Sequence, residues 1–310
     1  MKLILEKSEA ANDLIRVMSF RSESGDALPC YTAGAHIEFD LGKVGKRSYS
    51  LIDWPVPADL YTVAVQKELE GDGGSKSMHA IEIGQVIEIK PPQNNFELRA
   101  GDQSVLLLAG GIGITPMISL ATKLQQQSRT FQLHYTARDA SRMGFANVLE
   151  SFFGDAVSLN LDDVNPINLS HLMRSQAPNT SVYLCGPRAM IDAARAAALE
   201  SGLPEDSIHI ELFTAVDVQE GDTAFEVEIS STGQVVNVAA DQSIIEALEA
   251  AGVDVMYDCQ RGDCGICQTN VINGTPDHRD VVLTEAERAS GKVMQICVSR
   301  AKTARLIIDV

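Results

Sequence analysis

The sequence is poor in basic residues. It has 25 lysines and arginines against 42 aspartates and glutamates, which gives its 310 residues a formal net charge of −17 at pH 7. A nucleic-acid-binding protein needs a basic face that displaces counterions from the phosphates, so this composition argues against a nucleic-acid partner. An acidic chain is better suited to a protein partner that carries a basic patch.

The sequence also lacks a long apolar segment and an export signal. Its longest uncharged run, 103–122, is interrupted by three glycines and by Pro116, which predicts a strand, a tight turn and a helix rather than a membrane span. The N-terminus carries Glu6 and Glu9 where a secretory signal needs an apolar stretch. We therefore predict a cytoplasmic protein without a membrane partner, in which thiols stay reduced.

The chain is long enough for two or three domains, each with its own core. Residues 1–100 read as short strands separated by turn residues, which is typical of a small antiparallel β-barrel. In residues 101–222, apolar strand segments alternate with helical ones, which predicts a doubly wound α/β domain with a parallel sheet. Residues 223–310 begin with a hairpin and a helix over 243–251, for which Ser243 is the expected N-cap and Glu246 its capping-box partner.

The six cysteines are unevenly distributed, because three of them lie in the segment CQRGDCGIC. Cys259, Cys264, Cys267 and the later Cys297 follow the C-x4-C-x2-C…C ligand pattern of a plant-type 2Fe-2S cluster. Glycines between them let the loop turn its amides toward the sulfur atoms. A structural zinc site is the alternative, but it usually has two C-x2-C pairs and this segment has one. Cys30 lies outside any motif, and we interpret it as structural.

A glycine-rich turn follows the first strand of the predicted α/β domain. In LLLAGGIGITPM the glycines let the backbone approach a pyrophosphate, and the N-terminus of the next helix favours the anion. Alone, such a turn is a weak signal, because it is also consistent with a mere tight connection. A second strand-to-helix turn, YLCGPRAM, is expected at the same carboxyl edge of the sheet, where α/β domains bind ligands. The predicted dinucleotide site comprises Gly110, Gly111, Gly113, Thr115, Pro116, Cys185, Gly186 and Pro187.

These motifs resemble two known domains. Residues 223–310 resemble a plant-type ferredoxin domain of the β-grasp fold, and residues 101–215 resemble the NAD(P) domain of the ferredoxin-NADP reductase superfamily. The second resemblance implies that Gly110 to Pro116 hold the pyrophosphate and that Cys185 to Pro187 flank the nicotinamide. As an isolated residue, Cys185 is also consistent with a small apolar residue at the end of a buried strand.

The choice between NADH and NADPH depends on the segment HYTARDASRM. Arg138 and Arg142 follow a strand where the adenosine ribose is expected, and their charges suit the 2′-phosphate of NADPH. Asp139 beside them opposes such a phosphate. Members of this superfamily with a fused ferredoxin domain mostly use NADH, so the resemblance implies NADH.

A hydride carries two electrons and a 2Fe-2S cluster accepts one, so a converter such as a flavin is needed between them. In the predicted barrel, RSYS resembles the R-x-Y-S flavin motif of the same superfamily. Arg47 is a permanent cation for a phosphate, Tyr49 offers a flat ring, and Ser48 and Ser50 donate hydrogen bonds. A glycine-serine segment precedes an expected helix whose N-terminus suits a phosphate. The further predicted flavin residues are Ala64, Val65, Gln66, Gly73, Gly74 and Ser75.

With these flavin segments, the whole chain resembles the phthalate dioxygenase reductase and vanillate O-demethylase reductase family, in which the flavin, NAD and ferredoxin domains follow in this order. The resemblance implies FMN, and it implies that Phe213 covers the flavin ring, although a core Phe at a strand end is an alternative. Relatives often have Arg where this chain has Asp72. Either Lys76 or Arg47 replaces the missing phosphate contact, or FMN binds more weakly.

The predicted function is that of an NADH-dependent reductase, which passes single electrons from FMN through the 2Fe-2S cluster to a terminal oxygenase. The resemblance implies a Rieske non-haem iron oxygenase of aromatic-acid catabolism. Hydride transfer needs stacking and close approach rather than a general base. Ser50 and Thr115 are predicted to hydrogen-bond to flavin N5, and Cys185 and Phe213 to line the transfer site. The alternatives are an FAD- and NADPH-using reductase of the same superfamily, a cluster-based redox sensor, and a binding protein with a degenerate flavoreductase fold.

Overall fold

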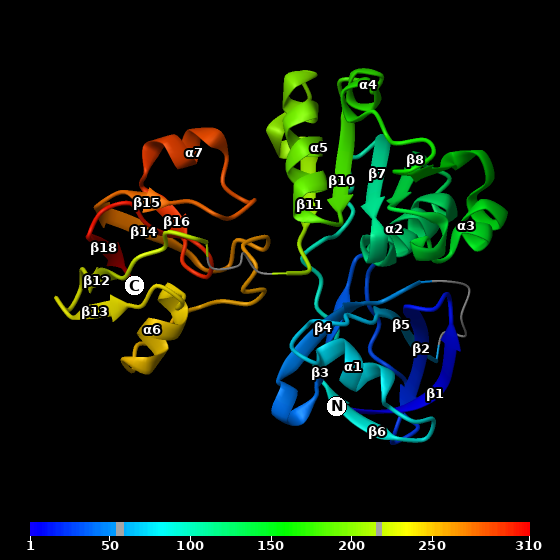
Figure 1. Cartoon of the computed structure of the whole chain (residues 1–310), viewed down its shortest axis with the longest axis horizontal. Coiled ribbons are helices and arrows are strands. Elements are labelled where there is room, and N and C mark those ends of the chain that lie inside the picture. The colour runs from blue at the N-terminus through cyan, green and yellow to red at the C-terminus, as the bar shows by residue number, and fades with distance from the viewer. Residues whose placement is uncertain (54–58, 215–218) are drawn as a thin grey trace. The chain divides into compact units, whose positions relative to one another are not determined.

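The computed structural model describes residues 1–53, 59–214 and 219–310. They form two compact units, Met1–Glu211 and Leu212–Val310 (Figure 1). The first unit contains two separate sheets and the second contains a third main sheet with a small two-stranded one. The boundaries of the three predicted domains stay a prediction. No helix among the described residues is long and apolar enough to cross a membrane.

The first sheet of the N-terminal unit is antiparallel and curled into a half-barrel, as the alternation of short strands and turns predicts. Its strand order is β4-β3-β6-β1-β2-β5, and an isolated bridge between Leu51 and Val63 joins the chain after β4 to β5, so the two edges meet. Apolar side chains from the strands and Met78 of α1 fill its core. The elements are β1 (Lys2–Ala10), β2 (Ile15–Ser22), β3 (His36–Asp40), η1 (Gly42–Val44), β4 (Lys46–Ser50), β5 (Tyr61–Gln66), α1 (Gly74–His79) and β6 (Val86–Ile89).

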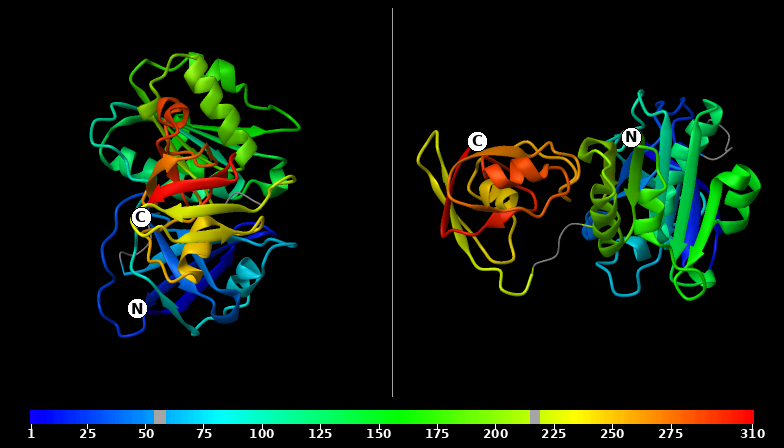
Figure 2. Two further views of the ribbon diagram at one scale, coloured as in Figure 1. Left: turned by 90° about the vertical axis from the view of Figure 1, so that its left-hand side faces the viewer. Right: turned by 90° about the horizontal axis from the view of Figure 1, so that it is seen from above.

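The second sheet is parallel and doubly wound, with helices packed along it (Figure 2). Its order is β11-β10-β7-β8-β9, so the chain reverses its winding direction between β7 and β10. Ligands of such sheets bind outside the carboxyl ends of the strands at this switch point. The strands are β7 (Ser104–Gly110), β8 (Thr130–Ala137), β9 (Val157–Leu161), β10 (Thr180–Cys185) and β11 (Ile208–Glu211). The helices are η2 (Gly111–Gly113), α2 (Ile114–Gln126), η3 (Ala140–Arg142), α3 (Ala146–Phe153), η4 (Gly154–Ala156), α4 (Leu169–Arg174), α5 (Arg188–Glu200) and η5 (Glu205–Ser207).

The C-terminal unit has a five-stranded mixed sheet of order β13-β12-β18-β14-β16, in which β12 and β18 are parallel. Helix α6 packs its buried face on the core of this sheet. Ser243 caps α6 as predicted, because its side chain accepts a hydrogen bond from the amide of Glu246. The elements are β12 (Phe225–Ile229), β13 (Val235–Val238), α6 (Ile244–Ala250), β14 (Gln268–Asn273), β15 (Pro276–Asp277), α7 (Glu285–Ser290), β16 (Val293–Gln295), β17 (Arg300–Ala301) and β18 (Arg305–Asp309).

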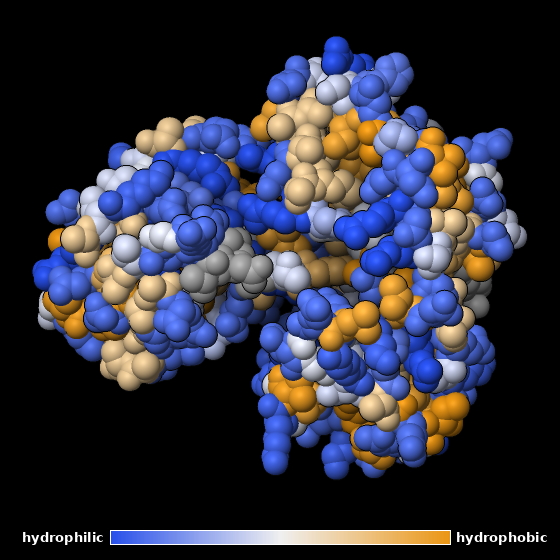
Figure 3. All heavy atoms as spheres, in the orientation of Figure 1, coloured by the Kyte–Doolittle hydropathy of each residue, from blue (hydrophilic) through white to orange (hydrophobic). Residues whose placement is uncertain are grey.

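The surface is mixed in hydropathy. On the face of the molecule that Figure 3 draws, hydrophilic residues lie between smaller hydrophobic areas on each unit. Separate exposed apolar residues of this kind are ordinary on protein surfaces and indicate no site by themselves.

Candidate functional site

The two glycine-containing turns lie against each other at the carboxyl edge of the parallel sheet. Strand β7 ends at Gly110 and its neighbour β10 ends at Cys185. A Cβ atom at Gly113 would lie 2.3 Å from the carbonyl oxygen of Cys185, and a Cβ atom at Gly110 would lie 2.7 Å from Cδ of Pro187. Glycine is required at both positions because no side-chain atom fits between the turns. The structure thus brings the predicted nucleotide residues together, while their contacts with a nucleotide remain a prediction.

A cavity of about 440 Å³ adjoins these turns at the ends of β7 to β10. It contains two cationic residues and Asp162, an acidic residue that the sequence reasoning did not select. The only signal for Asp162 was its position directly after the strand segment VSLNL. The cavity is lined by Leu14, Ile15, Gln66, Gly110, Gly111, Thr136, Ala137, Arg138, Arg142, Asp162, Ile167, Pro187 and Met190.

One of the two cationic residues of this cavity, Arg142, is paired with a carboxylate that does not itself line the cavity. Asp139 lies 3.5 Å from the guanidinium of Arg142 and accepts hydrogen bonds from the amides of Ser141 and Arg142. The hydroxyl of Ser141 also donates to Asp139 and holds the pKa of its carboxyl below the ordinary value. Asp162 accepts a hydrogen bond of 3.2 Å from the hydroxyl of Thr136. A second phosphate on the ribose would therefore meet carboxylates as well as guanidinium groups.

Thr115 is buried in the first turn of α2, and its hydroxyl donates to the carbonyl of Ile112 at 3.0 Å. This hydrogen bond closes the glycine-rich turn. Because a hydroxyl has one proton to donate, the contact competes with the predicted hydrogen bond from Thr115 to flavin N5. That role stays a prediction, as does the role of Phe213, which is half-buried two residues after β11.

The flavin residues predicted on β4 and α1 lie in contact. A Cβ atom at Gly74 would lie 2.8 Å from Cγ and Nε of Arg47, so the arginine side chain crosses directly over the start of α1. The guanidinium of Arg47 lies 3.6 Å from the carboxylate of Asp72, which is 93% exposed. Lys76 donates to the carbonyl of Leu69 at 2.6 Å. Asp72 therefore lies beside the cation that is predicted to bind the flavin phosphate.

The surroundings of Ser50, the last residue of β4, bear on whether the site fits a flavin. It is buried, and its Oγ atom has no hydrogen-bond partner among the residues that the structure describes. A buried polar atom without a partner costs about 1–3 kcal/mol, so a bound group that pairs with it is favoured. Burial of the adjacent Tyr49 raises the pKa of its phenol to about 12. The polar edge and flat ring of a flavin suit this combination.

In the C-terminal unit, the thiol groups of the four predicted ligand cysteines contact one another without a covalent bond. Cys259 contacts Cys264 and Cys297, and Cys267 contacts Cys297. The contact with Cys264 lowers the pKa of Cys259, whereas contacts with Cys259 raise the pKa of Cys264 and of Cys297. In the described part of the chain, no group of three or more His, Cys, Asp or Glu side chains could hold a metal ion. The structure thus brings together the four cysteines of the 2Fe-2S ligand pattern, while their coordination of a cluster remains a prediction.

Backbone amides and glycines shape the cysteine loop. The amide of Arg261 donates to the sulfur of Cys259 at 3.3 Å. Gly262 has a φ of +83°, and a Cβ atom there would lie 3.1 Å from Cα of Asp280, so the position requires glycine on both counts. The side chain of Asp263 is only 5% exposed and accepts a hydrogen bond from the amide of Leu212 at 2.7 Å.

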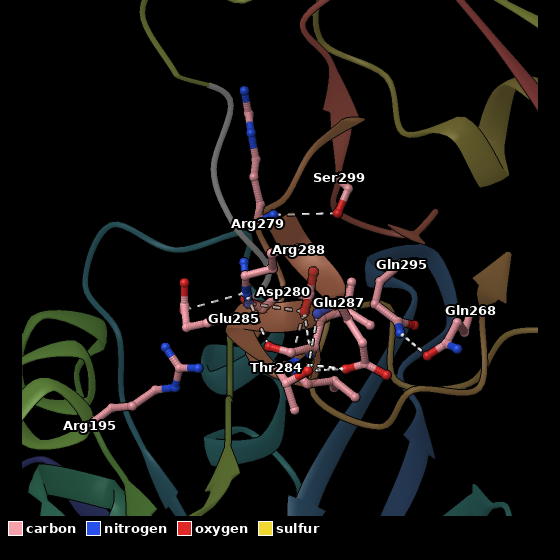
Figure 4. Close-up of polar contacts among 12 residues, drawn as sticks. Arg195, Gln268, Arg279, Asp280, Thr284, Glu285, Glu287, Arg288, Gln295 and Ser299 are labelled. Carbon is pink, nitrogen blue, oxygen red and sulfur yellow. Dashed lines mark hydrogen bonds and ion pairs between the residues drawn. The ribbon is translucent and has the colours of Figure 1, made fainter. Parts of the chain in front are cut away.

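A polar network supports this loop from the chain segment that follows it (Figure 4). Asp280 accepts hydrogen bonds from Arg288 at 3.1 Å and from the amide of Leu283 at 2.8 Å. The amide of Val281 donates to the carbonyl of Gly262 at 2.9 Å. On the other side of the loop, Gln295 lies 3.5 Å from the sulfur of Cys267. These contacts tie the cysteine loop to the segments that follow it.

Comparison with known proteins agrees with this arrangement. The family model described as the 2Fe-2S iron-sulfur cluster binding domain matches residues 227–302. Vanillate O-demethylase oxidoreductase of Pseudomonas sp. (strain HR199 / DSM 7063) is 39% identical over 305 residues, which cover 96% of both chains. Phenoxybenzoate dioxygenase subunit beta of Ectopseudomonas oleovorans is 38% identical over 301 residues, which cover 96% of this chain and 93% of that protein.

A solved structure of phthalate dioxygenase reductase, described as modular for electron transfer from pyridine nucleotides to 2Fe-2S, is also similar. It has a TM-score of 0.72 and 33% sequence identity, with 100% of this chain and 98% of that chain covered. These relatives match along almost the whole length of the chain. The chain therefore belongs to the family of oxygenase reductases that includes vanillate O-demethylase oxidoreductase and phthalate dioxygenase reductase.

Proposed function

We propose that this oxidoreductase takes electrons from NADH and delivers them singly, through FMN and a 2Fe-2S cluster, to a terminal oxygenase in the cytoplasm. The observation that supports this proposal most strongly is that one chain combines the two facing nucleotide turns, the buried unpaired hydroxyl of Ser50 at the end of the strand that carries Arg47, and four cysteines whose thiol groups contact one another. The flavin, when bound, supplies the conversion of a two-electron hydride into single electrons. The protein's own contribution is to hold and orient the groups between which the electrons move.

Within this function, the amides of the turn from Gly110 to Gly113 hold the pyrophosphate, and Cys185 to Pro187 flank the nicotinamide. Ser50 orients the flavin ring by hydrogen bonding, and Arg47 binds the flavin phosphate. Cys259, Cys264, Cys267 and Cys297 ligate the cluster through thiolates.

The preference for NADH is supported by the charges of the cavity. Asp162 lines the cavity, and Asp139 lies 3.5 Å from Arg142. Part of the positive charge available to a phosphate is therefore already neutralised, and Arg138 is the cavity's other cationic residue. A hydroxyl of the adenosine ribose can donate to a carboxylate, whereas the 2′-phosphate of NADPH is repelled by it. The catalytic efficiency with NADH should therefore exceed that with NADPH.

FMN is proposed over FAD because the predicted order of the flavin, NAD and ferredoxin regions is the one that the family resemblance associates with FMN. The partner is proposed as a Rieske non-haem iron oxygenase that acts on an aromatic acid or a similar compound. The reductase need not touch that compound, so its own sequence carries no direct signal for it.

The test uses the purified holoprotein. We expect absorbance near 450 nm, FMN in the released flavin, two irons and two sulfides per chain, fast flavin reduction by NADH, and turnover of the cognate oxygenase. A colourless preparation, or one with zinc in place of iron, would falsify the proposal. Released FAD with a preference for NADPH would establish the alternative reductase. Slow cytochrome c reduction with intact cofactors would instead favour a redox sensor.

A further inference from the structure

Helix α2 carries a buried polar contact with the barrel close to the nucleotide turn. The helix begins at Ile114, directly after the glycine turn, and Ser119 follows a little more than one turn later. Ser119 is 0% exposed. Its hydroxyl donates to the carbonyl of Leu51 at 2.7 Å and accepts from the amide of Asp53 at 2.7 Å. The side chain of Ser119 on the parallel sheet's helix therefore bridges Leu51 and Asp53, which follow strand β4 of the antiparallel sheet.

The bridged segment is the continuation of β4. It is held by the barrel too, because the amide of Leu51 donates to the carbonyl of Ala35 and the amide of Ile52 donates to the carbonyl of Thr62, both at 2.8 Å. Ser50, with its orphaned hydroxyl, directly precedes Leu51. A displacement of Leu51 would thus be transmitted to Ser50 through one peptide unit of fixed geometry.

The same helix therefore has two attachments. At its N-terminus, the glycine turn packs on the turn of Cys185 at the nucleotide site. About one turn further, Ser119 hydrogen-bonds to Leu51 and Asp53, which directly follow β4, the strand of the predicted flavin residues. An apolar residue at position 119 would leave the buried carbonyl of Leu51 and the partly buried amide of Asp53 without this partner. It would also replace two directional hydrogen bonds with an apolar contact that has no fixed geometry.

We propose that Ser119 is a positioning residue for hydride transfer, which fixes the separation between the nucleotide turn and the flavin strand. This inference rests on the proposed function. In the reaction, the C4–H bond of the dihydronicotinamide breaks and its hydrogen passes with both bonding electrons to flavin N5, which leaves NAD⁺ and a flavin reduced by two electrons. Such a transfer needs the reacting atoms about 3–3.5 Å apart, and a misplacement of about 1 Å costs roughly 100-fold in rate.

The test is Ser119→Ala, studied by stopped-flow reduction of the bound flavin over a range of NADH concentrations. Ser119 is not among the residues that line the cavity, so the Kd for NADH should change by less than about threefold. The limiting rate of flavin reduction should fall by about 10- to 100-fold, and the isotope effect with NADH deuterated at C4 should rise as hydride transfer becomes limiting. Reduction of the cluster by dithionite should not change.

Thr122→Ala is the matched control, because Thr122 is also buried in α2 and the change again removes a hydroxyl. NADH should reduce the flavin of Thr122→Ala at the wild-type rate. If Ser119→Ala lost its flavin, Ser119→Cys, which has a similar size and a weaker donor, would be measured and should give a slowed rate.

A wild-type limiting rate in both Ser119 variants, with only the melting temperature lowered, would show a merely structural role and overturn the inference. That failure differs from failure of the proposed function, in which NADH would not reduce the flavin of the wild-type protein at all.

Discussion

The substitution Gly113→Ala tests the close contact between the two nucleotide turns, because it adds a methyl group between them without straining the backbone. Gly113 has a φ of −61° and a ψ of −3°, which alanine adopts freely, so the substitution introduces no conformational strain. The added Cβ atom, however, would lie 2.3 Å from the carbonyl oxygen of Cys185 and 2.5 Å from its carbonyl carbon. Both are backbone atoms, so no side-chain rotation relieves the clash, and the two turns must separate by about 1 Å to reach ordinary contact.

The cost has two parts. Overpacking of this kind typically destabilises a protein by about 1–3 kcal/mol, and each kcal/mol lowers the Tm of a unit of this size by about 2–4 °C. A shift of about 1 Å between the turns should also slow flavin reduction by NADH roughly 100-fold. Calorimetry and stopped-flow absorbance near 450 nm measure the two effects separately.

Gly101→Ala is the control. Gly101 also lies outside the left-handed region, but a Cβ atom there meets no atom within 4 Å. This variant should match the wild type in both Tm and rate. If Gly113→Ala also bound and oxidised NADH as the wild type does, the two turns could not be in the close contact on which the nucleotide site depends.

Three further outcomes are expected. Asp72→Asn removes the carboxylate 3.6 Å from Arg47 and should tighten FMN binding by about two- to fivefold, since exposed pairs are worth below about 1 kcal/mol; a fluorescence titration with weaker binding would contradict the pairing. Asp222→Ala removes the acceptor of two hydrogen bonds from Arg279, of 2.9 and 2.5 Å, and should destabilise the C-terminal unit by about 3 kcal/mol at pH 7. The hydrogen bonds from Arg279 lower the pKa of Asp222 to about 2. The contribution of Asp222 to stability is therefore complete above its ordinary pKa of 3.8 and fades as the pH falls toward 2. Urea titrations measure the difference in unfolding free energy between variant and wild type, and a difference that grew in acid would refute this. Finally, residues 223–310 contain 13 Asp and Glu against 7 Lys and Arg, so electron delivery to the oxygenase should slow as salt rises, and a flat salt dependence would exclude steering.

The parts of the site that sequence reasoning found are those with short-range signals. The glycine turns follow buried strands directly, and the rule that ligands bind at the carboxyl edge of a parallel sheet places them together. The spacing of the cysteines is a local pattern as well. The cap of α6 was legible from Ser243 and Glu246 for the same reason, because both lie within one turn of the helix.

The missed features are mainly contacts between distant segments. Ser119 lies 66 and 68 residues from its partners, and nothing in the sequence near Ser119 distinguishes it from a buried helical serine. Asp162 became visible only when the strand order placed the end of β9 beside the cavity. Helix α7 is different, since Thr284 and Glu287 form the same capping box that identified α6, and this local signal was available but overlooked.

Strand β18 has a consequence for how the protein is made. It lies between β12 and β14, pairs with both, and is formed by residues 305–309. As the ribosome synthesises the chain, every cysteine of the loop emerges before this middle strand exists, so the sheet behind them has a gap. Iron and sulfide are therefore expected to load only once the strand has been inserted, and deletion of residues 305–309 should leave the cysteines without a stable cluster.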